Sequence, residues 1–386
     1  FWLKFHFQSL DISALHGPTT AMGPLLAAAS RSTGLRRLRR HRLPGLRWSA
    51  TSASRDGSWK TGLRRIIQAS SADRLLRTLE EEIPRPTFSI IHASAALTRF
   101  AKYRRSLTGE MARSRAWATL AERTRDFLSQ QQGNYERELC SIMWALAKLR
   151  AKSASLRETI VPAIIEGFPG EAGSLNSLDV SNMFWAVAVL RQEEPQLRGL
   201  LPRLTQEALA IVDTMGSQAI ANAVWSLGML DARGNEVEVL LDAICRHATQ
   251  SLSDFRSQEL ANMCWGLALC RRKDEVLMGE VAALIIARSD ALSDRSAEFD
   301  LPQIALAFAK LGISHPALMG VVAGRVASGL GSMNPWGICA LAWSCDHVAS
   351  DEALCDFRKR LDEELADRCF TVDDIAQSQF GPEEWQ

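Results

Sequence analysis

Several hallmarks of other protein classes are missing from this sequence. No uninterrupted apolar run approaches the roughly 18 to 20 residues that a membrane-spanning helix needs, so we expect no membrane span. There is no glycine-rich phosphate loop with a Lys, no His-Glu-x-x-His pair and no Gly-x-Ser-x-Gly turn. We therefore predict that the protein is not an enzyme and that it uses no cofactor.

Cysteine is present but forms no recognisable metal-binding motif. None of the eight Cys belongs to a Cys-x-x-Cys pair, and Cys339, Cys345 and His347 are spaced more widely than zinc ligands usually are. The Cys residues are scattered among Leu, Ala and Val, as buried small apolar residues are. We predict no metal site and buried thiols.

The overall composition is that of an ordinary folded protein. Hydrophobic residues make up 47% and charged residues 23% of the 386 positions, close to the averages for soluble domains. These values exclude a largely disordered, collagen-like or coiled-coil chain. The length suits two domains or one extended array.

The net charge of +1 is the sum of two unlike parts. Residues 1–65 carry 12 Lys or Arg against Asp11 and Asp56, a net charge of +10, so the rest carries 33 basic and 42 acidic residues, a net charge of −9. An acid-poor segment rich in Arg, Ser, Ala and Leu can form the cationic amphipathic helix that organelle import machinery accepts. We predict that residues 1–65 are an import segment and linker, with a mitochondrial presequence that starts at Met22. The alternatives are a solvated basic tail or a nucleic-acid arm.

Residues 1–21 precede that Met and stay outside the fold prediction, as a fragment end or as upstream sequence translated in frame. The presequence predicts the mitochondrial matrix as the location, with the plastid as the alternative.

Four of the 11 Trp stand in nearly the same surroundings, which reveals an internal repeat. They occur in SIMWALAKL (Trp144), NMFWAVAVL (Trp185), NAVWSLGML (Trp225) and NMCWGLALC (Trp265), at spacings of 41, 40 and 40 residues. An aliphatic residue stands five positions before each Trp, a polar residue three before, and small residues one and three after. Weaker copies extend the array over residues 66–386, with anchors near 95, 144, 185, 225, 265, 306, 340 and 380.

Each unit of about 40 residues contains two helical patterns and no strand pattern. The first segment is apolar nearly all round, and the second spaces Leu, Ile, Val and Ala at three and four residues. One hairpin cannot bury its apolar face alone, but stacked hairpins can. We predict an all-α fold, an α-solenoid of stacked helical hairpins, with the Trp residues in its core. Asn182, Asn222 and Asn262, three positions before the Trp, are predicted to satisfy backbone groups between units.

The motif L-A-N-x-x-W-A-L-A-x-L resembles the octotricopeptide repeat family and the helical repeats that precede the RAP domain in FAST-kinase-like organelle proteins. ELANMCWGLALC, AIANAVWSLGML and ELCSIMWALAKL carry the resemblance, which covers about residues 86–386. It implies a non-catalytic protein that binds single-stranded organellar RNA (mRNA or rRNA) and acts in RNA processing, RNA stability or ribosome assembly, with ribonucleoprotein or ribosomal proteins as further partners. No RAP-like segment follows the repeats, and the copies at 306 and 340 lack the Trp.

Basic residues recur where phosphate contacts would be useful. They cluster in the first unit and recur four or six residues after the anchors. The candidate RNA-binding residues are Arg99, Lys102, Arg104, Arg105, Lys148, Arg150, Arg191, Arg271, Arg272 and Lys310. The alternative for these residues is a set of solvated helix-end cations. The alternative for the protein is an interaction scaffold like HEAT or armadillo arrays, which the net charge of −9 favours.

Overall fold

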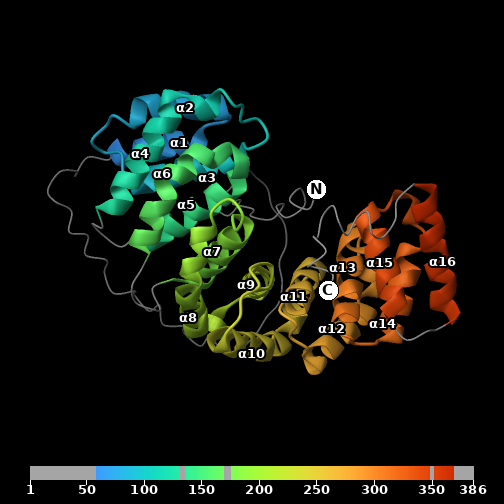
Figure 1. The fold of residues 1–386 in the computed structure, drawn as a ribbon. Coiled ribbons are helices and arrows are strands. Elements are labelled where there is room, and N and C mark those ends of the chain that lie inside the picture. The colour runs from blue at the N-terminus through green and yellow to red at the C-terminus, as the bar shows by residue number, and fades with distance from the viewer. Residues whose placement is uncertain (1–57, 131–134, 169–174, 348–351, 369–386) are drawn as a thin grey trace, which may run out of the picture. The chain divides into compact units, whose positions relative to one another are not determined.

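The computed structural model describes residues 58–130, 135–168, 175–347 and 352–368, which form α-helices and short turns with no strand among them (Figure 1). The all-α prediction is confirmed for these residues. The predicted presequence and the anchor near Phe380 lie outside them. The first described helix begins at Ser58, inside the segment predicted as linker.

Sixteen α-helices lie in the described residues, and they alternate between two roles. The odd-numbered helices are α1 (Ser58–Gln68), α3 (Ile90–Lys102), α5 (Glu136–Leu149), α7 (Ser177–Val189), α9 (Ser217–Met229), α11 (Ser257–Leu269), α13 (Leu301–Lys310) and α15 (Pro335–His347). The even-numbered helices are α2 (Ala72–Glu82), α4 (Arg115–Ser129), α6 (Ala154–Gly167), α8 (Leu201–Ile211), α10 (Asn235–Gln250), α12 (Glu275–Ala287), α14 (Pro316–Val326) and α16 (Glu352–Asp367).

Neighbouring helices pack in a regular order. Every odd-numbered helix packs against the next odd-numbered helix, from α1 to α15, and against the even-numbered helix that follows it in the chain. The even-numbered helices contact one another in the same sequence, except that α6 meets the 3-10 turn Pro195–Leu200 before α8. The predicted anchors from Ala95 to Ala340 all fall in odd-numbered helices.

The odd-numbered helices from α3 to α15 form the buried layer, as their nearly continuous apolar sequences predict, whereas α1 is polar and more exposed. Every residue of α13 from Leu301 to Ala309 is buried, and only isolated positions of α7, α9 and α11 are exposed. Trp185, Trp225 and Trp265 are buried and Trp144 is half-buried, so the prediction that these rings belong to the core is confirmed.

Small residues let α9 and α11 approach until their backbones touch. A Cβ atom added to Gly266 would lie 2.6 Å from the backbone nitrogen of Trp225 and 2.6 Å from the carbonyl carbon of Val224. A Cβ atom on Gly228 would lie 2.8 Å from the carbonyl oxygen of Gly266. The sequence prediction that small residues after the Trp permit close helix packing is confirmed at this pair.

The helices α9, α11 and α13 end in the same hydrogen-bonded turn. In each, the residue six positions after the anchor has a positive φ, a conformation that glycine adopts most easily: Asp231 (44°), Arg271 (56°) and Gly312 (62°). Its N–H and the next N–H donate to carbonyl groups in the last turn, the pattern of a Schellman motif: Gly228 and Leu227, Ala268 and Leu267, Ala309 and Phe308. We call this place in each unit the helix-end position.

Basic side chains near the ends of even-numbered helices bind the turn that lies just before the preceding odd-numbered helix. Each donates to the carbonyl oxygen of a buried apolar residue that follows a 3-10 turn 32 to 35 residues earlier in the chain. The pairs are His247 Nε2 with Met215, Arg288 with Phe255, Arg325 with Leu292 and Arg368 with Met333. These bonds satisfy buried carbonyl groups that helix geometry leaves open.

The prediction that polar residues three positions before the anchors satisfy backbone groups between units is confirmed only in part. At this position before Leu306, Gln303 donates its side-chain N–H to the carbonyl oxygen of Ala261, 3.1 Å away on α11, and Asn262 is buried beside it. The role of Asn182 and Asn222 stays a prediction.

The prediction of buried thiols holds for Cys140, Cys245, Cys264, Cys270 and Cys339. It holds only in part for Cys345, which is half-buried, and it is wrong for Cys355, which is exposed on α16, the last described helix.

Replacing Gly266 by Ala should destabilise the protein although alanine is the better helix former. The new Cβ atom would meet backbone atoms that no side-chain rotation can move, and overpacking of this kind costs about 1–3 kcal/mol. Gly279→Ala is the matched control, because Gly279 lies inside α12 with open space around it, and it should stabilise by about 0.5–1 kcal/mol. Urea unfolding of both variants checks this, and equal effects would contradict the close packing.

Candidate nucleic-acid interface

Two of the predicted phosphate contacts, Lys148 and Lys310, lie against Trp rings. The ammonium nitrogen of Lys148 is 5.7 Å from the ring centre of Trp144 and 5.3 Å from that of Trp185. The ammonium nitrogen of Lys310 is 5.4 Å from the ring centre of Trp265. Each lysine therefore joins two successive odd-numbered helices by a cation–π contact.

The site of Lys148 disfavours a charge. Burial, and to a smaller degree the positive charge of Arg104, lower the pKa of Lys148 from 10.5 to about 6. The two indole rings act in the opposite direction, because they attract the charged form. An anion brought to this site would favour the protonated form as well.

Arg150 and Arg271 are placed at helix ends with their backbone in the left-handed region. Arg150 has φ 43° and lies six residues after Trp144, the place that Arg271 takes after Trp265. Arg271 is exposed, and Arg150 is half-buried with a guanidinium nitrogen 3.2 Å from a carboxylate oxygen of Glu193. Arg191, at the same place after Trp185, donates to the carbonyl oxygen of Ala188 at 3.1 Å.

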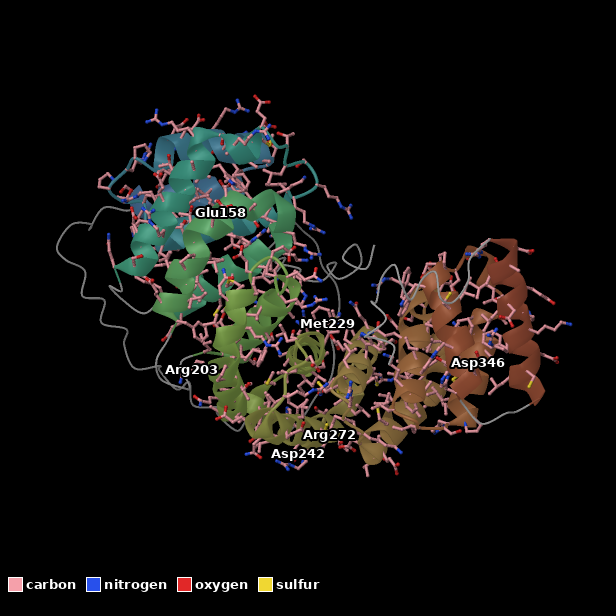
Figure 2. All side chains as sticks on the ribbon, in the orientation of Figure 1. Glu158, Arg203, Met229, Asp242, Arg272 and Asp346 are labelled. Carbon is pink, nitrogen blue, oxygen red and sulfur yellow. The ribbon has the colours of Figure 1, made fainter. Side chains whose placement is uncertain are left out.

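Arg272, like Arg150, has an acidic partner, but it meets two carboxylates. Its guanidinium forms an ion pair with Asp242 and lies 3.8 Å from a carboxylate oxygen of Glu238, both on α10. Figure 2 shows Arg272 and Asp242 together at this helix. This residue is therefore directed to the even-numbered layer, away from the row that the sequence predicts.

The four candidates of the first unit are also placed differently from one another. Arg99 donates to the carbonyl oxygen of Ala69 and to the hydroxyl oxygen of Tyr103, and its guanidinium carbon is 5.1 Å from the Tyr103 ring centre. Lys102 and Arg105 are exposed, and Arg104 is half-buried. Arg99 is thus a packing residue, while the other three remain open to a ligand.

One cation of this region was missed in the sequence. Lys152 donates its ammonium to the carbonyl oxygen of Arg104 at 2.7 Å and to that of Leu107. It thereby holds the turn after α3 against the end of α5. Together with Arg104, Lys148 and Arg150 it forms what we call the basic cluster. The position of Lys152, two residues after the candidate Arg150, could have identified it in the sequence.

The acids six positions before the anchors are helix caps. Asp179 accepts a hydrogen bond from the side-chain nitrogen of Asn176 at 2.5 Å, and Glu259 accepts one from the backbone nitrogen of Arg256 at 2.9 Å. Burial raises the pKa of Asp179. Both residues stand in the first turn of their helices, where carboxylates are stabilised. These positions are therefore occupied by structure and do not read bases.

Two histidines, His92 and His247, are bonded to the backbone. His92 is buried, its Nε2 donates to the carbonyl oxygen of Trp59 at 2.9 Å, and burial lowers its pKa. His247 donates to Met215 as described above. Within the described residues, no group of three or more His, Cys, Asp or Glu is placed to hold a metal ion, and no helix is long and apolar enough to cross a membrane.

Replacing Lys148 by Met should stabilise the protein at pH 7 by about 1 kcal/mol or more, because the half-buried ammonium no longer has to lose its proton or its water. In the native chain Lys148 is protonated below about pH 6, whereas the unfolded chain keeps this proton up to about pH 10.5. Stability of the native chain should therefore rise from pH 6 towards pH 10.5, and Lys148→Met should flatten this rise.

Urea unfolding at several pH values measures both effects, and Lys102→Met, on an exposed residue of α3, is the control that should change neither. Loss of stability in Lys148→Met at pH 7 would mean that the cation–π contacts outweigh burial, contrary to this expectation.

Comparison with known proteins adds no assignment: no protein-family model matches the sequence, and no curated protein matches it.

Proposed function

We propose that the described helices form an α-solenoid of hairpin repeats about 40 residues long, and that this array binds single-stranded RNA without catalysing a reaction. The proposal for the array is supported by three recurring features: odd-on-odd helix packing, the turn at the helix-end position and the cation–carbonyl bonds of the even-numbered helices. Each feature returns at the spacing of the Trp motif.

The observation that best supports RNA binding is the presence of arginine at the helix-end position of α5 and α11. A positive φ costs a residue with a Cβ atom about 1–2 kcal/mol, and Gly312 shows that glycine occurs at the same place. Arg150 and Arg271 occupy this costly conformation with side chains that reach solvent or the protein edge. A role for the guanidinium outside the fold explains why arginine stands there.

The mechanism is electrostatic and positional. Arg150, Arg191 and Arg271 stand at the ends of successive or nearby odd-numbered helices, and the basic cluster adds charge beside the first of them. A strand that follows these ends would meet a cation on α5, α7 and α11, with Asp231 at the helix-end position of α9 between them, and its contacts with the cations would give salt-dependent binding. Trp185, Trp225 and Trp265 are buried and cannot stack on bases, so in their units base selection must come from other residues.

The biological setting follows from the sequence. The basic segment 1–65 supports import into the mitochondrial matrix, with the plastid as the alternative. The resemblance to octotricopeptide repeats supports a part in RNA processing, RNA stability or ribosome assembly, on mRNA or rRNA and beside ribonucleoprotein or ribosomal proteins.

A protein-interaction scaffold is the second candidate, and exposed valines favour it. Val239 on α10 and Val276 on α12 are 46% and 70% exposed, and these two helices are neighbours. The net charge of −9 outside residues 1–65 agrees with a basic protein partner.

The double variant Arg150→Gly, Arg271→Gly separates function from fold. It should be more stable by about 0.5–1 kcal/mol per site, since glycine adopts positive φ without strain. It should bind a single-stranded RNA oligonucleotide more weakly, and the slope of log affinity against log salt should fall by about 0.7 for each phosphate that the variant no longer binds.

Asp231→Gly is the matched control, because it relieves the same conformation while removing an acid. It should be stabilised equally and bind RNA at least as well as the native chain. If the double variant and this control bind RNA alike, the helix-end arginines do not contact phosphates.

A further inference from the structure

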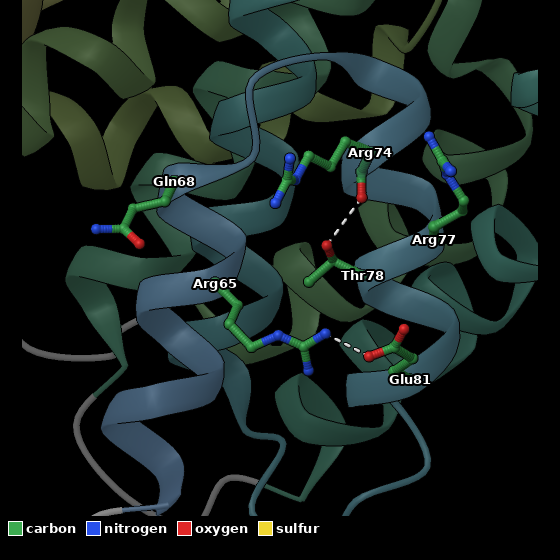
Figure 3. Close-up of a pocket in the computed structure, with 6 residues that line it drawn as sticks. All are labelled: Arg65, Gln68, Arg74, Arg77, Thr78 and Glu81. Atoms are coloured by element: carbon green, nitrogen blue, oxygen red, sulfur yellow. Dashed lines mark hydrogen bonds and ion pairs between the residues drawn. The ribbon is translucent and has the colours of Figure 1, made fainter.

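A cavity of about 340 Å³ lies between α1 and α2, far from the helix-end row in sequence (Figure 3). Its lining residues are Arg65, Gln68, Arg74, Arg77, Thr78 and Glu81. All six side chains are polar, and three guanidinium groups stand against one carboxylate. Pockets for neutral small molecules are mostly apolar, so this lining suits an anion.

One wall of the cavity is fixed by ion pairs. Arg65 of α1 binds Glu81 and Glu82 of α2, and Figure 3 shows its side chain directed across to Glu81. The hydrogen bond from Arg65 lowers the pKa of Glu81, which therefore stays ionised. These contacts hold the Arg65 guanidinium in place before any ligand arrives.

The other two arginines have charges that the fold does not use. Arg74 and Arg77 are exposed, and neither forms an ion pair with an acid of the described chain. Both stand in the first two turns of α2, where the helix dipole disfavours cations. Figure 3 shows Arg74 directed towards α1. The Thr78 hydroxyl donates to the carbonyl oxygen of Arg74 at 2.8 Å, so this hydroxyl is engaged. Figure 3 shows the Gln68 and Arg77 side chains directed outward at the two sides of the cavity, so the Arg74 guanidinium is the central donor for a ligand.

We propose that this cavity binds a phosphate monoester. Guanidinium groups offer pairs of parallel N–H donors that match phosphate oxygens. A monoester carries between about 1.5 and 2 negative charges at pH 7, more than a phosphate within a nucleic-acid strand. The lining's excess of two positive charges matches that value. Such a group is present at the phosphorylated end of a nucleic-acid strand and on a free nucleotide. The proposal goes beyond RNA binding by the helix-end row and does not depend on it.

The test compares ligands that differ only in this phosphate. Binding to the full chain is measured for two RNA oligonucleotides, one with a terminal phosphate and one with a hydroxyl, and for adenosine monophosphate against adenosine. The phosphorylated ligand should bind about tenfold more tightly, as charged hydrogen bonds to two arginines predict. The Arg74→Gln, Arg77→Gln double variant should abolish this difference. Arg64→Gln is the control, because Arg64 is exposed on α1 but does not line the cavity.

The outcomes separate the two ligand sources and the two proposals. A phosphate preference seen with oligonucleotides alone assigns the cavity to a strand end, and one seen with adenosine monophosphate assigns it to a free nucleotide. Equal binding of both oligonucleotides and no binding of the monophosphate would overturn the cavity proposal while leaving RNA binding by the helix-end row intact. A preference that survives in the double variant would overturn it too.

Discussion

Backbone contact between successive odd-numbered helices is the constraint on which the described structure depends. At Gly266 the backbone of α11 lies so close to the backbone of α9 that no side chain fits between them. Helices this close bury nearly every apolar side chain of their layer, Trp225 and Trp265 included. The turns, the caps and the exposed cations of that layer occur at helix ends, while a few polar side chains such as Asn262 are buried within it.

Because of this arrangement, the basic residues of the described chain fall into two groups with different roles. Those on even-numbered helices, such as Arg288 and Arg368, donate to carbonyl groups of neighbouring turns and take part in the fold. Of those at the ends of odd-numbered helices, Arg150 and Arg271 have a positive φ, which disfavours a residue with a Cβ atom. The bonds of the first group hold these side chains against the fold, although the guanidinium groups keep their charge. The second group is the part of the positive charge that a phosphate chain can reach.

Much of the fold could be predicted from the sequence, because the Trp motif and the small residues around it record a packing requirement that repeats. The helix-end cations Arg150, Arg191 and Arg271 followed from the same periodicity. The contacts of individual charged side chains could not be predicted from this periodicity. The contacts of Lys148 with Trp185 and of Lys310 with Trp265, and the ion pair of Arg272 with Asp242, join residues about 30 to 45 positions apart that only packing brings near. The cavity between α1 and α2 escaped prediction because its arginines belong to no repeated pattern, and residues 58–65 fall within the segment predicted as linker.

Crosslinking of single-stranded RNA to the full chain, with the linked peptides identified across a series of salt concentrations, tests the central claim most directly. The account predicts crosslinks in peptides that contain Arg150, Arg191 and Arg271 and in the turn after α3, all weakening as salt rises. Crosslinks confined to residues 1–65, or none in the helical part even at low salt, would contradict RNA binding by the array and favour a protein partner.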